Sequence, residues 1–183
     1  VLRPGEHLLY ITGKPYDTLH KVIGKPGDGT GSLQDFGIGY SEVALLEDGS
    51  PDWPAIQAAI QPNTKVIGIQ RSRGYSWRPS FTIAQIGEMV RFVKEINPEL
   101  IVFVDNCYGE FTELEEPTQV GVDLMAGSLI KNPGGGIAPS GGYIAGRRDL
   151  VELAAYRLTA PGIGGEVGAM LGATRAMFQG LFL

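Results

Sequence analysis

Lys131 occupies the position in this sequence that is best suited to covalent chemistry. It follows a short apolar strand predicted over 124–130, and Asn132, Pro133 and a run of three glycines come directly after it, which excludes a helix there. An isolated lysine at a strand end usually faces solvent. Between an apolar strand and tight glycines, however, the amine is expected to be desolvated, which frees the neutral form that attacks a carbonyl carbon. The pattern therefore favours covalent capture of an aldehyde.

Asp105 ends a second apolar strand, which is predicted over 101–104. Burying a carboxylate is costly unless it has a partner, and the protonated nitrogen of a pyridine ring would be such a partner. The alternative is that Asp105 caps the segment after it. A lysine and an acid at the ends of neighbouring strands are the two groups that pyridoxal 5'-phosphate chemistry needs. The pair Lys131 and Asp105 therefore predicts the cofactor domain of a pyridoxal-phosphate enzyme.

The residues around this pair offer supporting contacts. Tyr16 follows the first predicted strand and could stack on a planar ring, or it could be a half-buried aromatic residue at a helix start. Ser128 could donate a hydrogen bond to a phosphate oxygen or could cap its own loop, and Asn106 could orient the substituents of the ring. Cys107 is expected to be a small packing residue rather than a nucleophile.

The loop over residues 70–80 is rich in arginine and aromatic side chains. Arg71, Arg73 and Arg78 are candidates for recognising an anion, either a substrate carboxylate or the cofactor phosphate, and Tyr75 lies among them. A subunit interface is the alternative, because Arg, Tyr and Trp are enriched at interfaces. The two roles can hold together.

Apolar runs alternate with helical patterns along the chain, which predicts an α/β fold with a mostly parallel sheet and helices on both faces. Strands are expected at 7–11, 41–46, 65–70, 101–104, 124–130 and 142–145, and helices at 17–23, 52–60, 82–96, 147–157 and 166–183. In such sheets ligands bind outside the carboxyl ends of the strands. Ile11, Gln70, Val104 and Ile130 each precede a polar loop that leaves such an end, so these loops are expected to meet at one crevice.

Composition narrows the partners. The chain has 183 residues and a formal net charge of -5, which argues against nucleic acid. With one cysteine and two histidines, neither an internal disulfide nor a metal site is expected. The sequence shows no apolar run of the ~20 residues that span a membrane, no signal peptide and no nucleotide-binding glycine motif. A cytoplasmic, single-domain enzyme with a small-molecule substrate is the simplest expectation.

Five segments together carry a resemblance to a known group of enzymes. They are Thr-Gly-Lys-Pro-Tyr-Asp-Thr-Leu (12–19), Gln-Arg-Ser-Arg-Gly-Tyr-Ser-Trp-Arg-Pro-Ser (70–80), Val-Asp-Asn-Cys-Tyr-Gly-Glu-Phe (104–111), Gly-Ser-Leu-Ile-Lys-Asn-Pro-Gly-Gly-Gly (127–136) and Gly-Gly-Tyr-Ile-Ala-Gly-Arg (141–147). In this order they resemble fold-type I pyridoxal-phosphate enzymes of the cystathionine and methionine lyase group. More narrowly, the chain resembles the methionine gamma-lyase-like family known as aluminium resistance proteins.

The resemblance implies a fold and a set of roles. The fold would be the large, cofactor-binding domain of these enzymes over residues 1–183, with a mixed sheet of the seven-stranded type. Lys131 would hold the cofactor covalently, Asp105 would pair with the pyridine nitrogen, Tyr16 would stack on the ring and Ser128 would help to hold the phosphate. The family's serine- and glycine-containing phosphate loop would lie before Val1, and its carboxyl-terminal small domain, with an arginine for the substrate carboxylate, would lie beyond Leu183.

The activity implied is a carbon-sulfur lyase reaction, a β- or γ-elimination on a sulfur amino acid such as cystathionine, methionine or cysteine. An aminotransferase or an aldolase on the same scaffold is an alternative, because a cofactor site alone does not fix the reaction. A non-catalytic protein that binds the cofactor or a partner is a further alternative. The resemblance also implies self-association into a homodimer or homotetramer with shared active sites.

Overall fold

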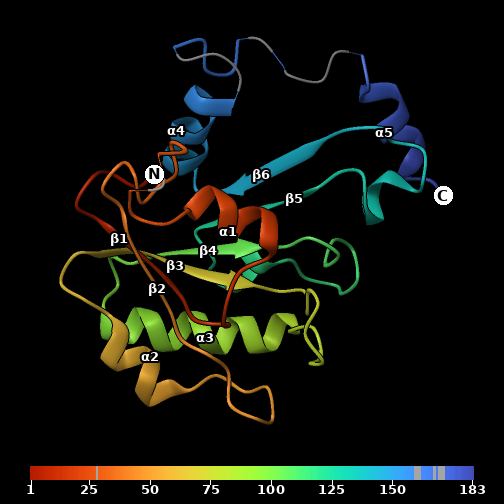
Figure 1. The fold of residues 1–183 in the computed structure, drawn as a ribbon. Coiled ribbons are helices and arrows are strands. Elements are labelled where there is room, and N and C mark those ends of the chain that lie inside the picture. Colours follow the sequence, from red (N-terminus) through yellow and green to blue (C-terminus); the bar gives the residue numbers. More distant parts are fainter. Residues whose placement is uncertain (28, 159–161, 167, 169–171) are drawn as a thin grey trace.

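The computed structural model describes residues 1–27, 29–158, 162–166, 168 and 172–183. In these residues strands and helices alternate, as the sequence predicts (Figure 1). The elements in chain order are β1 His7–Tyr10, α1 Asp17–Ile23, β2 Gly39–Glu42, α2 Trp53–Ala59, β3 Thr64–Gln70, α3 Ile83–Ile96, β4 Ile101–Asp105, the 3-10 turn η1 Pro117–Val120, β5 Leu124–Ser128, the 3-10 turn η2 Asn132–Gly134, β6 Gly142–Gly146, α4 Arg148–Leu158 and α5 Thr174–Gly180.

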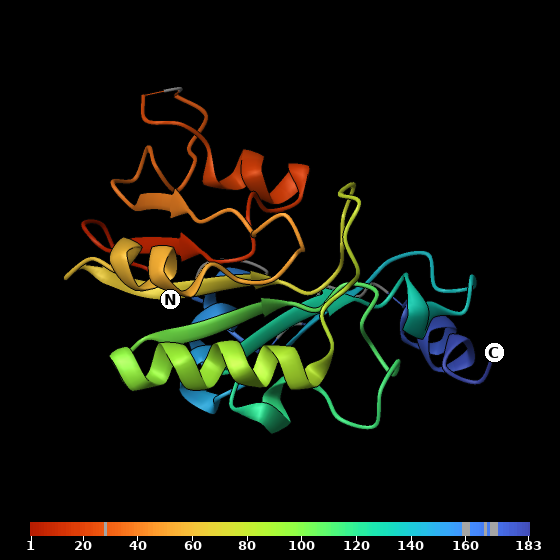
Figure 2. The same cartoon turned by 90° about the horizontal axis from the view of Figure 1, so that it is seen from below.

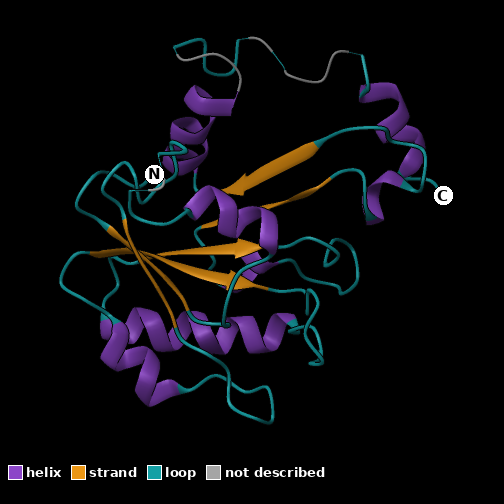
Figure 3. Ribbon diagram, viewed as in Figure 1, coloured by secondary structure: helices purple, strands orange, loops and turns teal. Residues whose placement is uncertain are grey.

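The strands form one sheet in the order β2-β1-β3-β4-β5-β6. Every neighbouring pair is parallel except β5 and β6, which run antiparallel (Figure 3). This confirms the mostly parallel, mixed sheet. The described residues contribute six strands to it, where the resemblance implied a sheet of the seven-stranded type.

Helices cover both faces of the sheet, as predicted (Figure 2). On one face α2 and α3 pack on a cluster that includes Ile56, Ile86 and Val102. On the other face Ile23 of α1 and Leu150 of α4 belong to a second cluster. Among the described residues, no helix combines the length and apolar character needed to cross a membrane.

The helix α3 shows how local sequence sets an element. Its buried face repeats at helical spacing through Ile83, Ile86, Val90 and Val93, which matches the sequence prediction. Thr82 begins it with a capping box: the Thr82 hydroxyl accepts from the Gln85 N–H at 3.2 Å, and the Gln85 side chain accepts from the Thr82 N–H at 2.9 Å. Asn97 ends it in an extended conformation.

Three elements differ from their predicted bounds by more than one residue. The strand expected at 41–46 is β2 at Gly39–Glu42, because its partner β1 offers only the four residues His7–Tyr10 for pairing. The strand expected at 124–130 ends at Ser128, because the Ser128 hydroxyl accepts a hydrogen bond from the Ile130 N–H and the chain turns there. The helix expected at 166–183 is confined to Thr174–Gly180, while 167 and 169–171 lie outside the described residues.

Candidate active site

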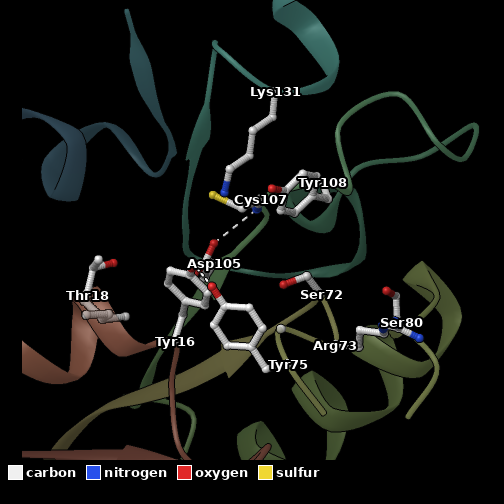
Figure 4. A pocket seen from close by; sticks show the side chains of 12 residues that line it. Tyr16, Thr18, Ser72, Arg73, Tyr75, Ser80, Asp105, Cys107, Tyr108 and Lys131 are labelled. Atoms are coloured by element: carbon white, nitrogen blue, oxygen red, sulfur yellow. Dashed lines mark hydrogen bonds between the residues drawn. The ribbon is translucent and has the colours of Figure 1, made fainter. Parts of the chain in front are cut away.

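A cavity of about 620 Å³ lies at the carboxyl ends of the strands (Figure 4). Tyr16 lines it from the segment after β1, Arg73 and Tyr75 from the loop after β3, Asp105 from the end of β4, and Lys131 from the loop after β5. Loops that are far apart in the sequence therefore meet at one crevice, as the alternation of strands and helices predicted.

Lys131 stands at the turn between β5 and η2 and is half-buried. Its amine lies 4.2 Å from the centroid of the Tyr108 ring, a cation–π contact that orients the side chain into the cavity. Tyr108 has a left-handed backbone with φ 68°, which is uncommon for a residue other than glycine. The bend that brings this ring beneath the amine is thus a strained one.

Asp105 presents its carboxylate to the same cavity from the neighbouring strand. One oxygen, Oδ1, accepts from the Cys107 N–H at 3.1 Å, and the Asp105 carbonyl accepts from the Arg71 N–H at 3.0 Å. Cys107 lies beside both charged groups. Its burial, with the Asp105 carboxylate, raises the pKa of the thiol to about 11, and Lys131 acts in the opposite direction. Cys107 is therefore a neutral thiol at neutral pH, which agrees with a packing role.

Tyr16 and Tyr75 form a pair at the cavity wall. Their hydroxyl groups are 3.0 Å apart and hydrogen-bonded, and their ring centroids are 5.4 Å apart with planes tilted by 31°. The hydrogen bond from Tyr75 raises the pKa of the Tyr16 hydroxyl. Arg73 also lines the cavity, and its guanidinium lies 5.6 Å from the centroid of the Trp77 ring.

The other two arginines of the loop donate their hydrogen bonds to acceptors within the protein. Arg71 is buried, and all five N–H donors of its guanidinium have acceptors: the carbonyls of Phe81 and Gly109 and the side chains of Asn106, Thr112 and Glu113. The Arg78 guanidinium donates to the carbonyls of Gln70, Ser72 and Pro79 and stacks at 4.4 Å on Phe81. Of the three arginines, the structure brings only Arg73 to the cavity.

Ser128 and Asn106 also lie outside the cavity lining. The Ser128 hydroxyl accepts from the Ile130 N–H at 3.2 Å, which is the loop-capping contact considered as the alternative to phosphate binding. The Asn106 side chain is fully buried: its oxygen accepts from Arg71, and its amide group donates to Glu116 and Tyr143.

Sequence reasoning did not assign Tyr108, Glu110 or Tyr143, which contact the functional residues directly. Glu110 is only 4% exposed and accepts from the Ser128 N–H and the Tyr143 hydroxyl. The sequence signal that could have identified Glu110 is its position in Val-Asp-Asn-Cys-Tyr-Gly-Glu-Phe (104–111), one of the segments that carry the family resemblance. A glutamate in a loop is usually exposed, so its burial could not be read from residue type.

The groups that line the cavity fit pyridoxal phosphate. The cofactor has an aldehyde, a planar ring and a ring nitrogen that can be protonated; the cavity offers an amine at Lys131, an aromatic side chain at Tyr16 and a carboxylate at Asp105. A metal ion finds no comparable set of ligands. In the part of the chain that the structure describes, no group of three or more His, Cys, Asp or Glu residues could hold one.

Known proteins are similar to this chain over its whole length. Residues 1–183 match the model of the family described as methionine gamma-lyase. The uncharacterized protein YnbB of Bacillus subtilis is 63% identical over 100% of this chain and 44% of its own length.

Two solved structures are similar over the whole chain. A Listeria monocytogenes protein, provisionally assigned as a cystathionine beta-lyase involved in aluminum resistance, has a TM-score of 0.95 and 63% identity, with 46% of that chain covered. A Clostridium novyi carbon-sulfur lyase involved in aluminum resistance has a TM-score of 0.92 and 52% identity, with 44% of that chain covered. The chain thus spans less than half the length of these relatives. It belongs to the methionine gamma-lyase family.

Proposed function

We propose that residues 1–183 form the cofactor-binding domain of a pyridoxal-phosphate-dependent carbon-sulfur lyase. The observation that carries the proposal is the placement of Lys131 and Asp105. Asp105 ends β4, Lys131 lies in the loop after the adjacent strand β5, and both line the same cavity of about 620 Å³, with Tyr16 on its wall. Family membership supports elimination of a sulfur leaving group as the reaction.

Bound pyridoxal phosphate would supply an electron sink for the charge that forms at the substrate α-carbon. The protein would contribute position and proton transfer. Lys131 would hold the aldehyde through its Nζ and, once displaced by the substrate amine, would accept the α-proton at the same atom. Asp105 would keep the ring nitrogen protonated by pairing with it, because a carboxylate within contact distance favours the charged form of a base.

Substrate recognition in this proposal involves Arg73 and Tyr75. Arg73 is the arginine of the loop that lines the cavity, so its guanidinium is the candidate of this chain for an anionic group such as the substrate carboxylate. Tyr75 holds the Tyr16 ring in place through their hydrogen bond. The substrate class proposed is a sulfur amino acid, with cystathionine, methionine and cysteine as the compounds to test.

We also propose that the phosphate-binding loop and the small domain belong to segments outside this chain, and that the enzyme is a cytoplasmic homodimer or homotetramer. The first point is supported by the coverage of 44–46% of the length of the relatives. Self-association is supported by a group of exposed side chains on the loops after β3 and β4. These are Tyr75, Trp77, Tyr108, Phe111 and Leu114.

Two variants of Lys131 test the reaction. The protein is incubated with pyridoxal phosphate and each of the three amino acids, and thiol, keto acid and ammonia are measured. Lys131→Ala and Lys131→Arg are both expected to abolish turnover, a loss of at least ~10³-fold, although arginine keeps a cation over the Tyr108 ring.

Lyase activity retained in either variant would refute the role of Lys131. Formation of pyridoxamine phosphate in place of ammonia and thiol would assign the protein as an aminotransferase. Cofactor binding without any product across a broad panel of amino acids would favour a non-catalytic binding protein.

A further inference from the structure

A chain of buried hydrogen bonds lies next to the cavity, in residues that the proposed chemistry leaves unused. Arg71 Nη1 donates to Asn106 Oδ1 at 2.9 Å, and Asn106 Nδ2 donates to the Tyr143 hydroxyl at 3.0 Å. The Tyr143 hydroxyl in turn donates to Glu110 Oε1 at 3.2 Å. The chain therefore connects the start of the loop after β3 to β6 and ends on a carboxylate.

The Glu110 carboxylate also binds the end of β5. Its Oε1 accepts from the Ser128 N–H at 3.2 Å, so one oxygen joins β5 to the Tyr143 side chain of β6. The other oxygen, Oε2, is buried and has no hydrogen-bond partner among the described residues. Burying a carboxylate oxygen without a hydrogen-bond partner costs free energy.

Backbone carbonyls of residues 108–110 hold Asn132, the residue that follows Lys131. Asn132 Nδ2 donates to the Tyr108 carbonyl at 3.0 Å and to the Glu110 carbonyl at 3.3 Å. Ser128 before Lys131 and Asn132 after it are thus both fixed to residues 108–110. The Lys131 amine itself packs on the Tyr108 ring.

Gly127 makes room for this arrangement. A Cβ atom at this position would lie 2.3 Å from Glu110 Oε1 and 2.4 Å from the Tyr143 hydroxyl, distances that the packed side chains cannot accept without moving. Glycine next to Ser128 is therefore what allows the carboxylate to approach the strand.

We propose that Glu110 is a positioning residue for Lys131: its carboxylate fixes the end of β5 while its backbone fixes Asn132, so the amine is presented to the cavity. The functional importance of Glu110 rests on the proposed function of Lys131, but its effect on the placement of the Lys131 amine can be tested without cofactor. Glu110 acts as a hydrogen-bond acceptor in this account, and an uncharged acceptor of the same shape should replace it.

The test is competitive trace acetylation of the full-length protein without cofactor, read by peptide mass spectrometry. The rate at Lys131 is divided by the rate at Lys21, which is exposed and lies on α1. Glu110→Ala removes both hydrogen bonds that the Glu110 carboxylate accepts, from the Ser128 N–H and the Tyr143 hydroxyl, and is expected to raise this ratio by about threefold to tenfold. Glu110→Gln should stay within about twofold of the original protein, because its amide oxygen still accepts.

Lys94 supplies the control for general loosening, since its amine pairs with Asp123 at 2.8 Å, directly before β5 and thus at the opposite end of that strand from Ser128. Its ratio to Lys21 should not change in Glu110→Ala. An unchanged Lys131 ratio in Glu110→Ala, an equal rise at Lys94, or a Glu110→Gln variant that behaves like the alanine variant would overturn the proposal.

If Glu110→Ala does not fold, Tyr143→Phe and Gly127→Ala disturb the same contact from its other partners, and both should raise the Lys131 ratio. Gly165→Ala is the matched glycine control, because a Cβ there meets nothing within 4 Å. A failure of Lys131 to bind pyridoxal phosphate would contradict the proposed function and leave these acetylation ratios as an independent result.

Discussion

Cys107 lies between groups of opposite charge in the cavity, and its chemistry is set by them. Burial and the Asp105 carboxylate raise the pKa of its thiol to about 11, although the Lys131 amine pulls in the opposite direction. A thiol with this pKa holds very little thiolate at neutral pH and is a poor nucleophile. The residue thus reports on the charge of Asp105, which the proposed reaction needs.

Replacing Asp105 by Asn should therefore make Cys107 more reactive. Without the neighbouring negative charge the pKa of the thiol falls toward its ordinary value, so the rate of alkylation by iodoacetamide at pH 8 should rise about threefold to tenfold. Asp149→Asn, at an exposed position on α4, is the control and should leave the rate unchanged. A rate that falls or stays constant in Asp105→Asn would contradict the electrostatic account of this cavity.

At the scale of elements, the sequence predicts which residues meet at the carboxyl ends of the strands better than it predicts the last residue of each strand. Lys131 and Asp105 could be placed together because parallel strands deliver their carboxyl ends to one edge, and α3 could be placed from its apolar spacing. The end of β5 at Ser128 depends on a side-chain bond to Ile130 that no periodicity predicts. Likewise, the loop after β3 has three arginines that residue type alone does not distinguish. Only tertiary contacts direct Arg71 into the core and Arg73 into the cavity.

The cap of α3 gives a prediction at this scale. Thr82→Ala removes the hydroxyl that accepts from the Gln85 N–H and should lower the free energy of unfolding by about 1 kcal/mol. Thr82→Ser retains the hydroxyl and should lose less than half of that amount. Glu88→Ala, at an exposed site on the same helix, should change the free energy by under ~0.5 kcal/mol. Urea unfolding followed by circular dichroism would measure all three, and equal effects for the Ala and Ser variants would contradict the capping role.

For the molecule as a whole, His7 joins the strands at the edge opposite the cavity. It is 2% exposed, and its two ring nitrogens lie 2.9 Å from the hydroxyls of Thr64 on β3 and Ser41 on β2. Burial lowers the pKa of His7 below its ordinary value, so the folded state favours the neutral ring. The unfolded chain, with an ordinary histidine pKa of about 6.5, binds the proton more readily.

The free energy of unfolding should consequently decrease as the pH is lowered. The contribution of His7 is fully present above about pH 6.5 and is lost as the pH falls below that value, because the unfolded state takes up more protons there. The free energy of unfolding is expected to decrease as the pH falls from 7.5 to 5.5. His7→Gln should flatten this part of the profile. An equal slope in His7→Gln and the original protein would show that other groups cause the loss.

In the proposed function, Lys131 captures the aldehyde of pyridoxal phosphate in the cavity that it shares with Asp105 and Tyr16. The most direct measurement is incubation with pyridoxal phosphate, reduction with borohydride and peptide mass spectrometry. A pyridoxyl group is expected on the Lys131 peptide at high occupancy, with little on the Lys21 peptide, and Lys131→Arg should abolish this labelling. A Lys131 peptide that stays unmodified, or labelling spread evenly over the exposed lysines, would contradict the claim.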